Sequence, residues 1–418
     1  MEESLYRERK TCRACGDELK DVLDLGELPI SSFLDPGDPP IRKYPVRLAL
    51  SQTSGLVQLR HTVNSDQMYL KYWYMSGVNQ LMKESLRLIV QQGLDRLGGN
   101  IGRGSVVVDI GANDGTLLSF YPDYVTRVGI DPAKNIKPVC CDCHINDYFS
   151  ADNYKKVFGG EKAKLITSIA MFYDLEDPIG FCRDLADILS HRGLWIMEVS
   201  YIGTMLSRCA FDTICAEHLE YYSLRSIEYI LDKVGLKVED AELNDVNGGS
   251  FRLYIRHAAQ AQETEAVKNL REQEQAMQFD NPETYKKFAR KIAENKQEMV
   301  TFLKTQKREG KLVLGYGAST KGNTLMAYYG IDTSLMPFIA DRNPIKWGKE
   351  TVTGIPIVSE DQARAMSPDY FVAFPYHFIA EFLEREKAFL SSGGQFVSPV
   401  PCLKLFRGSC DNYFDDET

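Results

Sequence analysis

The sequence predicts an α/β protein in which a small N-terminal β domain precedes two α/β units in tandem. Three observations lead to this prediction. Residues 1–65 are rich in proline, glycine and cysteine and contain short apolar pieces, which is typical of a loop-rich β domain. Buried-strand patterns alternate with helical patterns over residues 66–258, and this alternation restarts after about residue 310. Strands that alternate with helices favour parallel sheets covered on both faces.

The composition limits the possible partners. The 418 residues, 44% of them hydrophobic and 26% charged, suffice for two or three domains. A net charge of −9 disfavours a nucleic acid partner. The chain has no run of 18 apolar residues and no secretory signal at its start, so we expect no membrane partner. Ten cysteines then fit the reducing cytoplasm, where we expect a monomer or a small homo-oligomer.

The regular elements follow from the apolar periodicity. We expect helices over residues 70–94 and 178–189, and buried strands over residues 105–110, 127–130, 165–170 and 194–199. From about Ala259 to Arg308 the pattern is helical and charged, and Asn281–Pro282 is expected to begin a second helix there, because proline is tolerated in a first turn. We therefore divide the chain into domains over residues 1–65, 66–258 and 259–418, the last with a helical linker.

The run VVVDIGANDGTLL predicts a buried strand, a glycine-rich turn and a helix. Glycine lets the backbone approach a ligand closely. Asp109 and Asp114 would repel a pyrophosphate but attract a cation, and Asp131 at the next strand end can accept both hydroxyls of a ribose. These features favour S-adenosylmethionine as the cofactor. The expected cofactor site contains Asp109, Gly111, Asn113, Asp114, Gly115 and Asp131.

The motifs DIGANDGTLL, MFYDLEDP, FDTICAEHLEYYSL and GYGASTKGN resemble, in this order and over essentially the whole chain, those of the sugar C-methyltransferases. Members of that family use S-adenosylmethionine to methylate a ring carbon of a nucleotide-linked keto-deoxysugar. The resemblance implies a zinc-ribbon-like N-terminal domain, a central Rossmann-like methyltransferase domain and a C-terminal Rossmann-like domain, with the sugar nucleotide between the last two. It also implies methylation at C-3, beside a ketone at C-4.

The expected zinc ligands depart from this resemblance. Cys12 and Cys15 form the first ligand pair, but Ser51 and Ser54 replace the second. A structural zinc ion needs four thiolate or imidazole ligands, and a serine hydroxyl is not ionised at neutral pH, so we expect the metal to be lost or weakly bound. The other cluster, CCDCH at residues 140–144, is expected on a strand, where alternating side chains cannot converge on one ion.

His218, preceded by Glu217, is the strongest candidate for a catalytic base. Methylation at carbon requires removal of a proton beside the ketone, and histidine suits this step near neutral pH. The resemblance also assigns the base to the position of His218, and Glu217 is expected to orient a neighbour or stabilise protonated forms. A phenol can stabilise the charge that develops on the ketone oxygen, and Tyr74 and Tyr222 are the favoured donors.

Other residues are expected to line the same site. Phe172, Tyr173 and Asp174 follow a buried strand and therefore lie at the ligand edge of the sheet. We assign Tyr72 and Phe172 to the cofactor, and Asp174, Ser76, Asn79 and Tyr221 to the substrate.

The run KLVLGYGASTKGN predicts a second strand, glycine turn and helix, with a cation and no acid in the turn. Exposed amides, hydroxyls and an ammonium at a helix N-terminus suit a sugar-nucleotide diphosphate. The residues expected to bind it are Gly317, Ser319, Thr320, Lys321 and Asn323. An NAD-dependent sugar oxidoreductase remains open because of Asp341 at the next strand end, as does an O- or N-methyltransferase acting on a nucleotide sugar.

Overall fold

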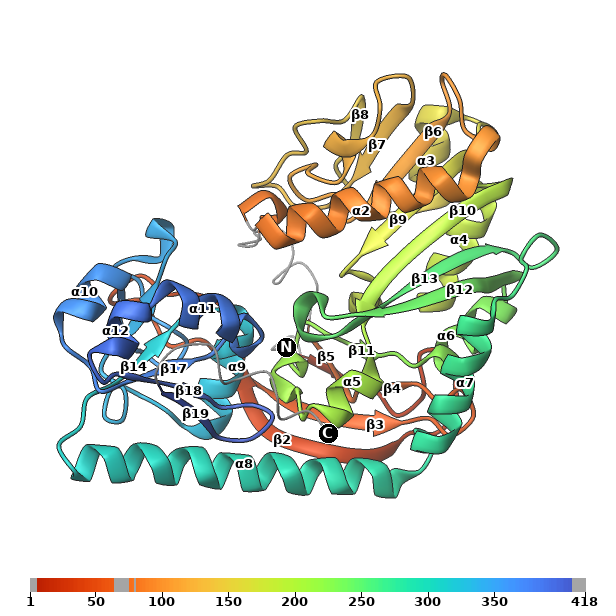
Figure 1. Ribbon diagram of the computed structural model, residues 1–418. Helices are drawn as coiled ribbons and strands as arrows, with labels where there is room; N and C mark the ends of the chain where they lie inside the picture. The colour runs from red at the N-terminus through yellow and green to blue at the C-terminus, as the bar shows by residue number, and fades with distance from the viewer. Residues whose placement is uncertain (1–5, 64–74, 79, 408–418) are drawn as a thin grey trace. The chain divides into compact units, whose positions relative to one another are not determined.

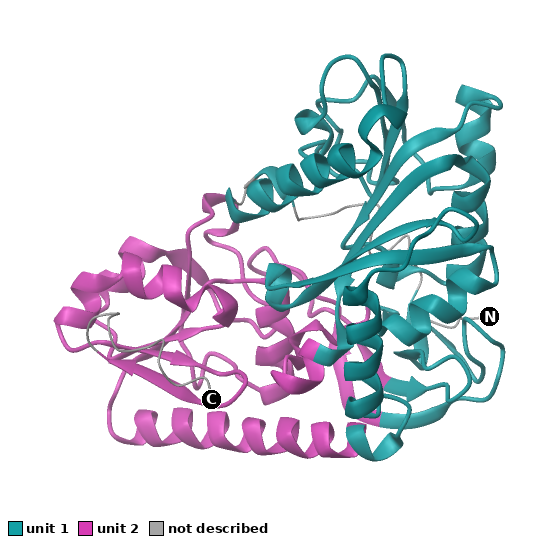
Figure 2. Cartoon of the chain, turned by 45° about the vertical axis from the view of Figure 1, so that its right-hand side comes forward, with its two compact units in different colours: residues 1–22, 48–203, 217–284 teal, residues 23–47, 204–216, 285–418 magenta. Residues whose placement is uncertain are grey.

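The computed structural model describes residues 6–63, 75–78 and 80–407, which form four β-sheets and the helices that cover them (Figure 1). The contacts within the chain define two compact units (Figure 2). Unit 1 contains residues 1–22, 48–203 and 217–284, and unit 2 contains residues 23–47, 204–216 and 285–418. Each unit thus combines distant parts of the sequence. The division of the chain into three domains, with boundaries after residues 65 and 258, remains a prediction.

The N-terminal region is a loop-rich β structure, as the sequence predicts. Its strands are β1 (Tyr6–Glu8), β2 (Lys20–Pro29), β3 (Lys43–Leu50), β4 (Val57–Leu59) and β5 (His61–Val63). β1 pairs with β5, and β2, β3 and β4 belong to a four-stranded sheet of order β11-β4-β3-β2. Its edge strand β11 (Glu220–Tyr221) comes from a distant part of the chain, two residues after the candidate base.

The large sheet of unit 1 has seven strands in the order β12-β13-β10-β9-β6-β7-β8. They are β6 (Val106–Ile110), β7 (Thr126–Ile130), β8 (Cys143–Ile145), β9 (Ala163–Ile169), β10 (Leu189–Ser200), β12 (Leu236–Asn244) and β13 (Ser250–His257). The strands from β6 to β10 are parallel, but β13 is antiparallel to both β10 and β12. The predicted parallel sheet is therefore only part of a mixed sheet, which the strand-helix alternation does not reveal.

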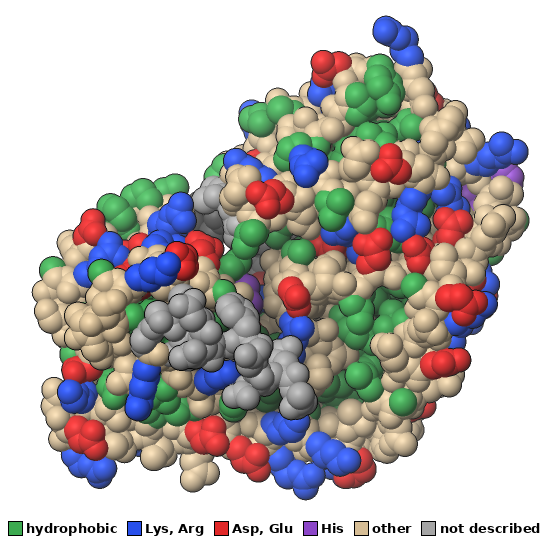
Figure 3. Space-filling model, in the orientation of Figure 1, with side chains coloured by type: hydrophobic (Ala, Val, Ile, Leu, Met, Phe, Trp, Pro, Cys, Tyr) green, Lys and Arg blue, Asp and Glu red, His purple; other side chains and the backbone are tan. Residues whose placement is uncertain are grey.

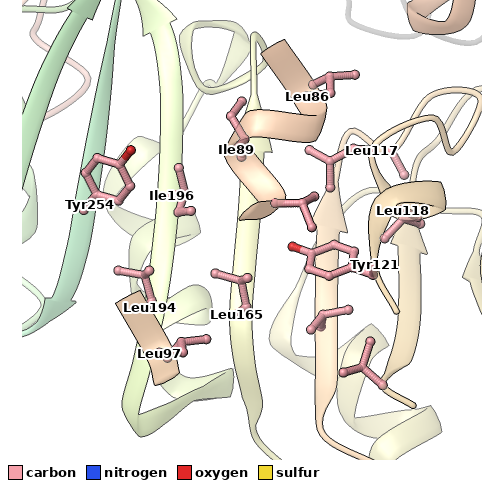
Figure 4. Packing of buried hydrophobic residues seen from close by; sticks show 14 of the residues in the cluster. Leu86, Ile89, Leu97, Leu117, Leu118, Tyr121, Leu165, Leu194, Ile196 and Tyr254 are labelled. Atoms are coloured by element: carbon pink, nitrogen blue, oxygen red, sulfur yellow. The ribbon is translucent and has the colours of Figure 1, made fainter. Parts of the chain in front are cut away.

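The helices of unit 1 bury apolar faces against this sheet. They are α2 (Gln80–Leu97), α3 (Ala151–Phe158), α4 (Pro178–Ile188), α6 (Leu224–Asp232) and α7 (Glu265–Met277), and α5 (Ile202–Ser207) continues into unit 2. Figure 4 shows Ile89 of α2 packed in one cluster with Leu165 of β9 and Ile196 of β10. A Cβ at Gly93 would lie 2.7 Å from Leu165 Cδ2, so glycine permits the close approach of α2. Each such buried Leu or Ile stabilises the fold by ~1.5–3 kcal/mol.

Two predicted elements of unit 1 differ from the structure. The helix expected over residues 70–94 starts at Gln80 and ends at Leu97, while residues 70–74 and 79 lie outside the described residues. The CCDCH segment is strand only from Cys143, because Cys140 and Cys141 lie in the loop before this strand. The expectation of strand cysteines is thus wrong for these two residues.

Unit 2 has a six-stranded sheet of order β16-β15-β14-β17-β18-β19. Its elements are β14 (Val313–Tyr316), α9 (Thr320–Tyr329), β15 (Ile339–Asp341), β16 (Ile357–Ser359), α10 (Glu360–Ala365), β17 (Tyr370–Ala373), α11 (Ile379–Arg385), α12 (Lys387–Ser391), β18 (Gln395–Ser398) and β19 (Lys404–Arg407). All neighbouring strands are parallel except β18 and β19. The long helix α8 (Pro282–Arg308) precedes this sheet and begins at the proline, as predicted.

The surface carries mixed charge. Figure 3 shows acidic and basic side chains interspersed over the face that it draws, including its lower edge, where α8 runs. Within the described ranges, every helix is too short or too polar to cross a membrane.

Candidate functional site

The first glycine-rich loop leaves the carboxyl end of β6. Gly111 has φ +76°, a conformation that favours glycine, and a Cβ there would lie 3.1 Å from Met171 Cγ. The helix expected after this loop is only a 3-10 turn over Leu118–Phe120. This part of the prediction was wrong, and it means that the loop does not point a long helix N-terminus, the usual phosphate site, at a ligand.

Polar side chains of this loop bind backbone N–H groups of the chain itself. Asn113, with φ +49°, accepts a hydrogen bond from Ser76 N at 3.1 Å. Asp114 accepts from Gly77 N at 2.8 Å and from Thr116 Oγ1 at 2.7 Å. Asp114 is buried and holds the 76–77 turn. Ser76, which was expected at the substrate, contacts the first loop instead.

Asp131 lies directly after β7 and shapes the same loop. Its Oδ2 accepts from Asn113 N at 2.8 Å, and its Oδ1 accepts from Ala133 N at 2.8 Å. Each carboxylate oxygen can accept two hydrogen bonds, so each keeps one lone pair for a ligand hydroxyl. The residue is 9% exposed, which fits a carboxylate that holds a bound ribose.

Asp109 has a different environment from the one we expected. Its side chain is 4% exposed and accepts from Thr167 Oγ1 of β9 at 2.6 Å. The pKa of Asp109 is raised to about 7, chiefly by burial; the hydrogen bond from Thr167 lowers it in part, and the charge of Asp131 makes a smaller contribution that raises it. Asp109 therefore joins β6 to β9 in the interior, where it is not placed to meet the cationic end of a cofactor.

Gly115 also has a structural reason. Its φ is +80°, and a Cβ there would lie 2.9 Å from Val139 N. Glycine at this position allows two backbone segments to pack closely, so its presence is explained without a bound ligand.

His218 lies beside a turn that follows β9. Its ring centroid is 4.3 Å from that of Tyr173, and Leu219 N donates to Tyr173 O at 2.8 Å. Tyr173 belongs to the 3-10 turn Phe172–Asp174, which starts three residues after the end of β9. Glu217 and His218 are both half-buried. The structure thus places His218 at the carboxyl edge of the large sheet, where such folds bind their ligands.

Two predicted site residues belong to the core. Phe172 is fully buried and packs against Phe181 and Trp195. Tyr222 is also fully buried, and its hydroxyl donates to Glu220 Oε2 at 2.6 Å. Because both side chains are fully buried, Phe172 presents no surface to a cofactor, and the Tyr222 hydroxyl is already engaged with Glu220.

The remaining candidates around His218 have mixed outcomes. Asp174 is half-buried in the turn beside Tyr173, whereas Tyr221 is 4% exposed in β11. Tyr72, Tyr74 and Asn79 lie outside the described residues, and their roles remain predictions.

The second glycine-rich loop joins β14 to α9. Gly317 has φ +82°, and a Cβ there would lie 2.5 Å from Pro375 Cγ, so its glycine is required by packing. Ser319 caps α9 by accepting a hydrogen bond from Gly322 N at 2.9 Å. The strand, turn and helix of the prediction are confirmed here.

An N-terminal segment of the chain covers part of this turn. Asn323 is 1% exposed and donates to Ser32 O at 2.8 Å, and Thr320 O accepts from Ser31 Oγ at 2.8 Å. Asn323 therefore anchors the 31–32 segment and does not face a phosphate or a sugar hydroxyl. Sequence spacing cannot reveal a partner almost 300 residues away.

Lys321 has an acidic neighbour that the sequence analysis did not identify. Burial raises the pKa of Asp212, while the charge of Lys321 and a 3.0 Å hydrogen bond from Tyr376 partly offset this shift. Burial, together with Lys321, lowers the pKa of His377 to about 3. At neutral pH the half-buried Lys321 therefore lies in a polar cluster with a neutral imidazole. The motif FDTICAEH contains Asp212, but nothing in its pattern indicates this electrostatic interaction with Lys321.

Asp341 is occupied by a neighbouring lysine. Its Oδ2 accepts from Lys346 Nζ at 3.1 Å, and its Oδ1 accepts from Asn343 N at 2.7 Å. A carboxylate neutralised in this way is a poor ligand for the ribose of NAD.

The cysteines of the N-terminal region meet the two serines. Cys12 Sγ lies 3.3 Å from Ser54 Oγ, and Cys15 Sγ lies 3.2 Å from Ser51 Oγ. In the described residues, no group of three or more His, Cys, Asp or Glu side chains is placed to hold a metal ion.

Comparisons with known proteins identify three consecutive matches. Family models match a zinc binding domain over residues 12–69, a methyltransferase domain over residues 82–241 and a C-methyltransferase C-terminal domain over residues 245–401. The C-methyltransferase NovU of Streptomyces niveus is 29% identical over 412 residues, which cover 96% of this chain and 97% of that protein.

Solved structures match part of the chain. The plantazolicin methyltransferase BpumL in complex with SAH is 12% identical with a TM-score of 0.33, and the match covers 41% of this chain and 81% of that one. An S-adenosylmethionine-dependent methyltransferase of Clostridium acetobutylicum is 12% identical with a TM-score of 0.32, and the match covers 43% of this chain and 93% of that one.

Proposed function

The chain belongs to the S-adenosylmethionine-dependent C-methyltransferases, and on this premise we propose that it methylates C-3 of a nucleotide-linked 4-keto-deoxysugar in the cytoplasm. Bound S-adenosylmethionine supplies the electrophilic methyl group. The observation that carries the proposal is the position of His218 beside Tyr173, at the same sheet edge as the first glycine-rich loop.

The contacts within unit 1 connect the base to that loop. Met171 packs on Gly111, and Tyr173, two residues later, packs on His218. These contacts support a base close to the loop to which we assign the methyl donor, since ligands of such sheets bind at the carboxyl ends of the strands.

The proposed reaction needs one proton transfer by the protein. The imidazole of His218 takes the proton from C-3, and the C–H electron pair forms an enolate with the ketone at C-4. The enolate carbon then accepts the methyl group, S-adenosylhomocysteine is released, and the imidazolium returns its proton to solvent. Since Tyr222 is buried, Tyr74 remains the predicted donor to the enolate oxygen.

We assign the two ligands by the groups that each glycine-rich loop offers. Asp131 accepts hydroxyl groups of the nucleoside at the first loop, and the Ser319–Lys321 turn binds the anionic diphosphate. The buried contacts of Asn323 remove its side chain from the proposed diphosphate site, and Gly317, which packing requires to be glycine, has no side chain to contribute. The remaining charged donor of this turn is Lys321.

Solvent exchange tests the enolate directly. The enzyme is incubated in deuterium oxide with S-adenosylhomocysteine and a nucleotide-linked 4-keto-6-deoxyhexose, and mass spectrometry follows the substrate. We expect deuterium to enter beside the ketone with wild type and not with His218→Asn. His191→Asn, which changes an exposed histidine, should exchange like wild type.

The methylated product then distinguishes the alternatives. NMR should place the new methyl group on a ring carbon. A methyl group on oxygen or nitrogen, without deuterium entry, would identify an O- or N-methyltransferase instead. A sugar oxidised or reduced at the expense of added nicotinamide cofactor would support the oxidoreductase.

A further inference from the structure

Two turns of the N-terminal region have the same backbone design. The first contains Cys12 and Cys15 and ends at Gly16, and the second contains Ser51 and Ser54 and ends at Gly55. In each turn the glycine N–H donates to the carbonyl of the first residue, at 3.0 Å to Cys12 O and 2.9 Å to Ser51 O. Both glycines have positive φ, +76° for Gly16 and +72° for Gly55. The two serines thus occupy the positions that correspond to the two cysteines.

The four side chains converge on one another. Cys12 faces Ser54 at 3.3 Å and Cys15 faces Ser51 at 3.2 Å, and both serines are fully buried. Four thiolates around one zinc ion, at Zn–S distances of about 2.3 Å, lie about 3.8 Å from one another. The two observed sulfur–oxygen separations are slightly shorter, so each Cys-Ser pair already has nearly the spacing of two neighbouring ligands in a tetrahedral site.

The donor set does not fit the zinc ion that the matched domain implies. Two thiols and two hydroxyls offer at most two anionic ligands, and serine remains protonated at neutral pH. In the described residues, no further His, Cys, Asp or Glu side chain lies close enough to join Cys12 and Cys15 as a third zinc ligand.

Hydrogen bonds perform the structural role instead. Cys12 Sγ accepts from Gln58 Nε2 at 3.2 Å and from Ala14 N at 3.3 Å. Ser54 Oγ accepts a hydrogen bond from Leu56 N at 3.3 Å, and Ser51 Oγ accepts one from Ser54 N at 3.4 Å. The polar atoms of the quartet are therefore satisfied by the protein, as buried polar atoms must be.

We propose that this domain folds without metal, because a hydrogen-bonded Cys-Ser quartet replaces the zinc ion, and that restoring two thiols recreates a zinc site. The prediction concerns Cys12, Cys15, Ser51 and Ser54 and is independent of the substrate. If the proposal is correct, the fold with these two turns forms without the metal ion.

Metal analysis of four full-length proteins tests the proposal. Wild type, Ser51→Ala/Ser54→Ala and Ser51→Cys/Ser54→Cys are purified in zinc, dialysed and analysed for bound metal. Ser119→Cys/Ser207→Cys, which adds two exposed thiols elsewhere, is the matched control. We expect one equivalent of zinc in Ser51→Cys/Ser54→Cys and far less than one equivalent in the other three.

Two further measurements keep the outcome decisive. Cobalt(II) should give thiolate charge-transfer bands and the spectrum of a tetrahedral site only in Ser51→Cys/Ser54→Cys. A chelator should lower the thermal midpoint of that variant and leave that of wild type unchanged. About one equivalent of zinc in wild type, lost in Cys12→Ser, would overturn metal independence. A folded Ser51→Cys/Ser54→Cys protein that binds no zinc would overturn the convergent geometry.

Discussion

The imidazole of His218 packs against the phenol ring of Tyr173, with ring centroids 4.3 Å apart and ring planes tilted by 52°. The two residues are 45 positions apart in the sequence, and the backbone hydrogen bond from Leu219 N to Tyr173 O fixes their register. The ring contact therefore limits the rotation of the candidate base, and it connects His218 to the end of β9.

Replacing His218 should abolish proton abstraction and preserve cofactor binding. We expect His218→Asn to lower kcat by about 10²–10⁴-fold, the usual contribution of a general base. Calorimetry should show an unchanged Kd for S-adenosylhomocysteine, because His218 is not in the first loop. His191→Asn should keep wild-type kcat. Normal methylation by folded His218→Asn would contradict the assigned base.

Tyr173 should act as a positioning residue through its ring. Tyr173→Phe keeps the aromatic face and should retain most activity, whereas Tyr173→Leu removes it. Aromatic pairs contribute about 0.5–1.5 kcal/mol, so kcat of Tyr173→Leu should fall by about 2–12-fold, with little change in KM. The pH profile of kcat should also shift in Tyr173→Leu alone. If Tyr173→Phe loses as much activity, the hydroxyl and not the ring is the important group.

Replacing Tyr222 should affect stability and not catalysis. Its hydroxyl donates to the buried Glu220, whose Oε1 has no hydrogen-bond partner among the described residues. Tyr222→Phe should therefore lower the free energy of unfolding by about 1–3 kcal/mol and leave kcat within about twofold. Tyr154→Phe, which removes a buried hydroxyl without a partner in the described structure, should be nearly neutral. A large fall in kcat at normal stability would restore Tyr222 as the oxyanion donor.

The two ligands should respond to different charges. Asp131→Asn should lower the affinity for S-adenosylhomocysteine by about 10–100-fold and leave the affinity for a nucleoside diphosphate unchanged. Lys321→Met should lower the affinity for the nucleoside diphosphate by a similar factor and leave that for S-adenosylhomocysteine unchanged. The reason is that hydrogen bonds to charged groups contribute about 1.5–3 kcal/mol. The exposed residues Asp123 and Lys304 provide the controls Asp123→Asn and Lys304→Met, which should change neither affinity. Calorimetric titration measures all four. An exchange of the two effects would reverse the ligand assignment.

Buried acids should make the protein less stable as the pH rises. Burial raises the pKa of Asp109 and of Glu274 to about 7, above their values in the unfolded chain. The folded state therefore binds more protons than the unfolded state between about pH 4 and pH 7. The stability that these groups contribute is complete below pH 4 and is lost as the pH rises through 7.

Asp109→Asn isolates this effect, because the amide oxygen still accepts from Thr167 and cannot ionise. The stability of Asp109→Asn relative to wild type should increase as the pH rises from 4 to 8. Denaturant unfolding at several pH values measures this difference. A difference that does not depend on pH would show that Asp109 has an ordinary pKa.

Local pattern predicted much of the fold. The strands β6, β7, β9 and β10 and the start of α8 at Pro282 lie where periodicity and proline indicate them. The antiparallel strands β12 and β13 were not assigned in this sheet, since sequence periodicity does not encode the partner or direction of a strand. The helix expected after the first loop is a 3-10 turn for a related reason, because the tertiary contacts of that loop override local preference.

By itself the sequence determined the kind of chemistry: a glycine-rich turn with Asp131 one strand away, a histidine in the motif AEHLEYY, a lysine-headed turn, and a cysteine pair matched by two serines. Only the tertiary structure decided which side chains reach a ligand. Asn323 faces Ser32, Tyr222 faces Glu220 and Asp109 faces Thr167. These polar atoms are buried between segments that are far apart in the chain, and a buried polar atom needs a hydrogen-bond partner. Because the partner comes from a distant segment, no local sequence pattern specifies it.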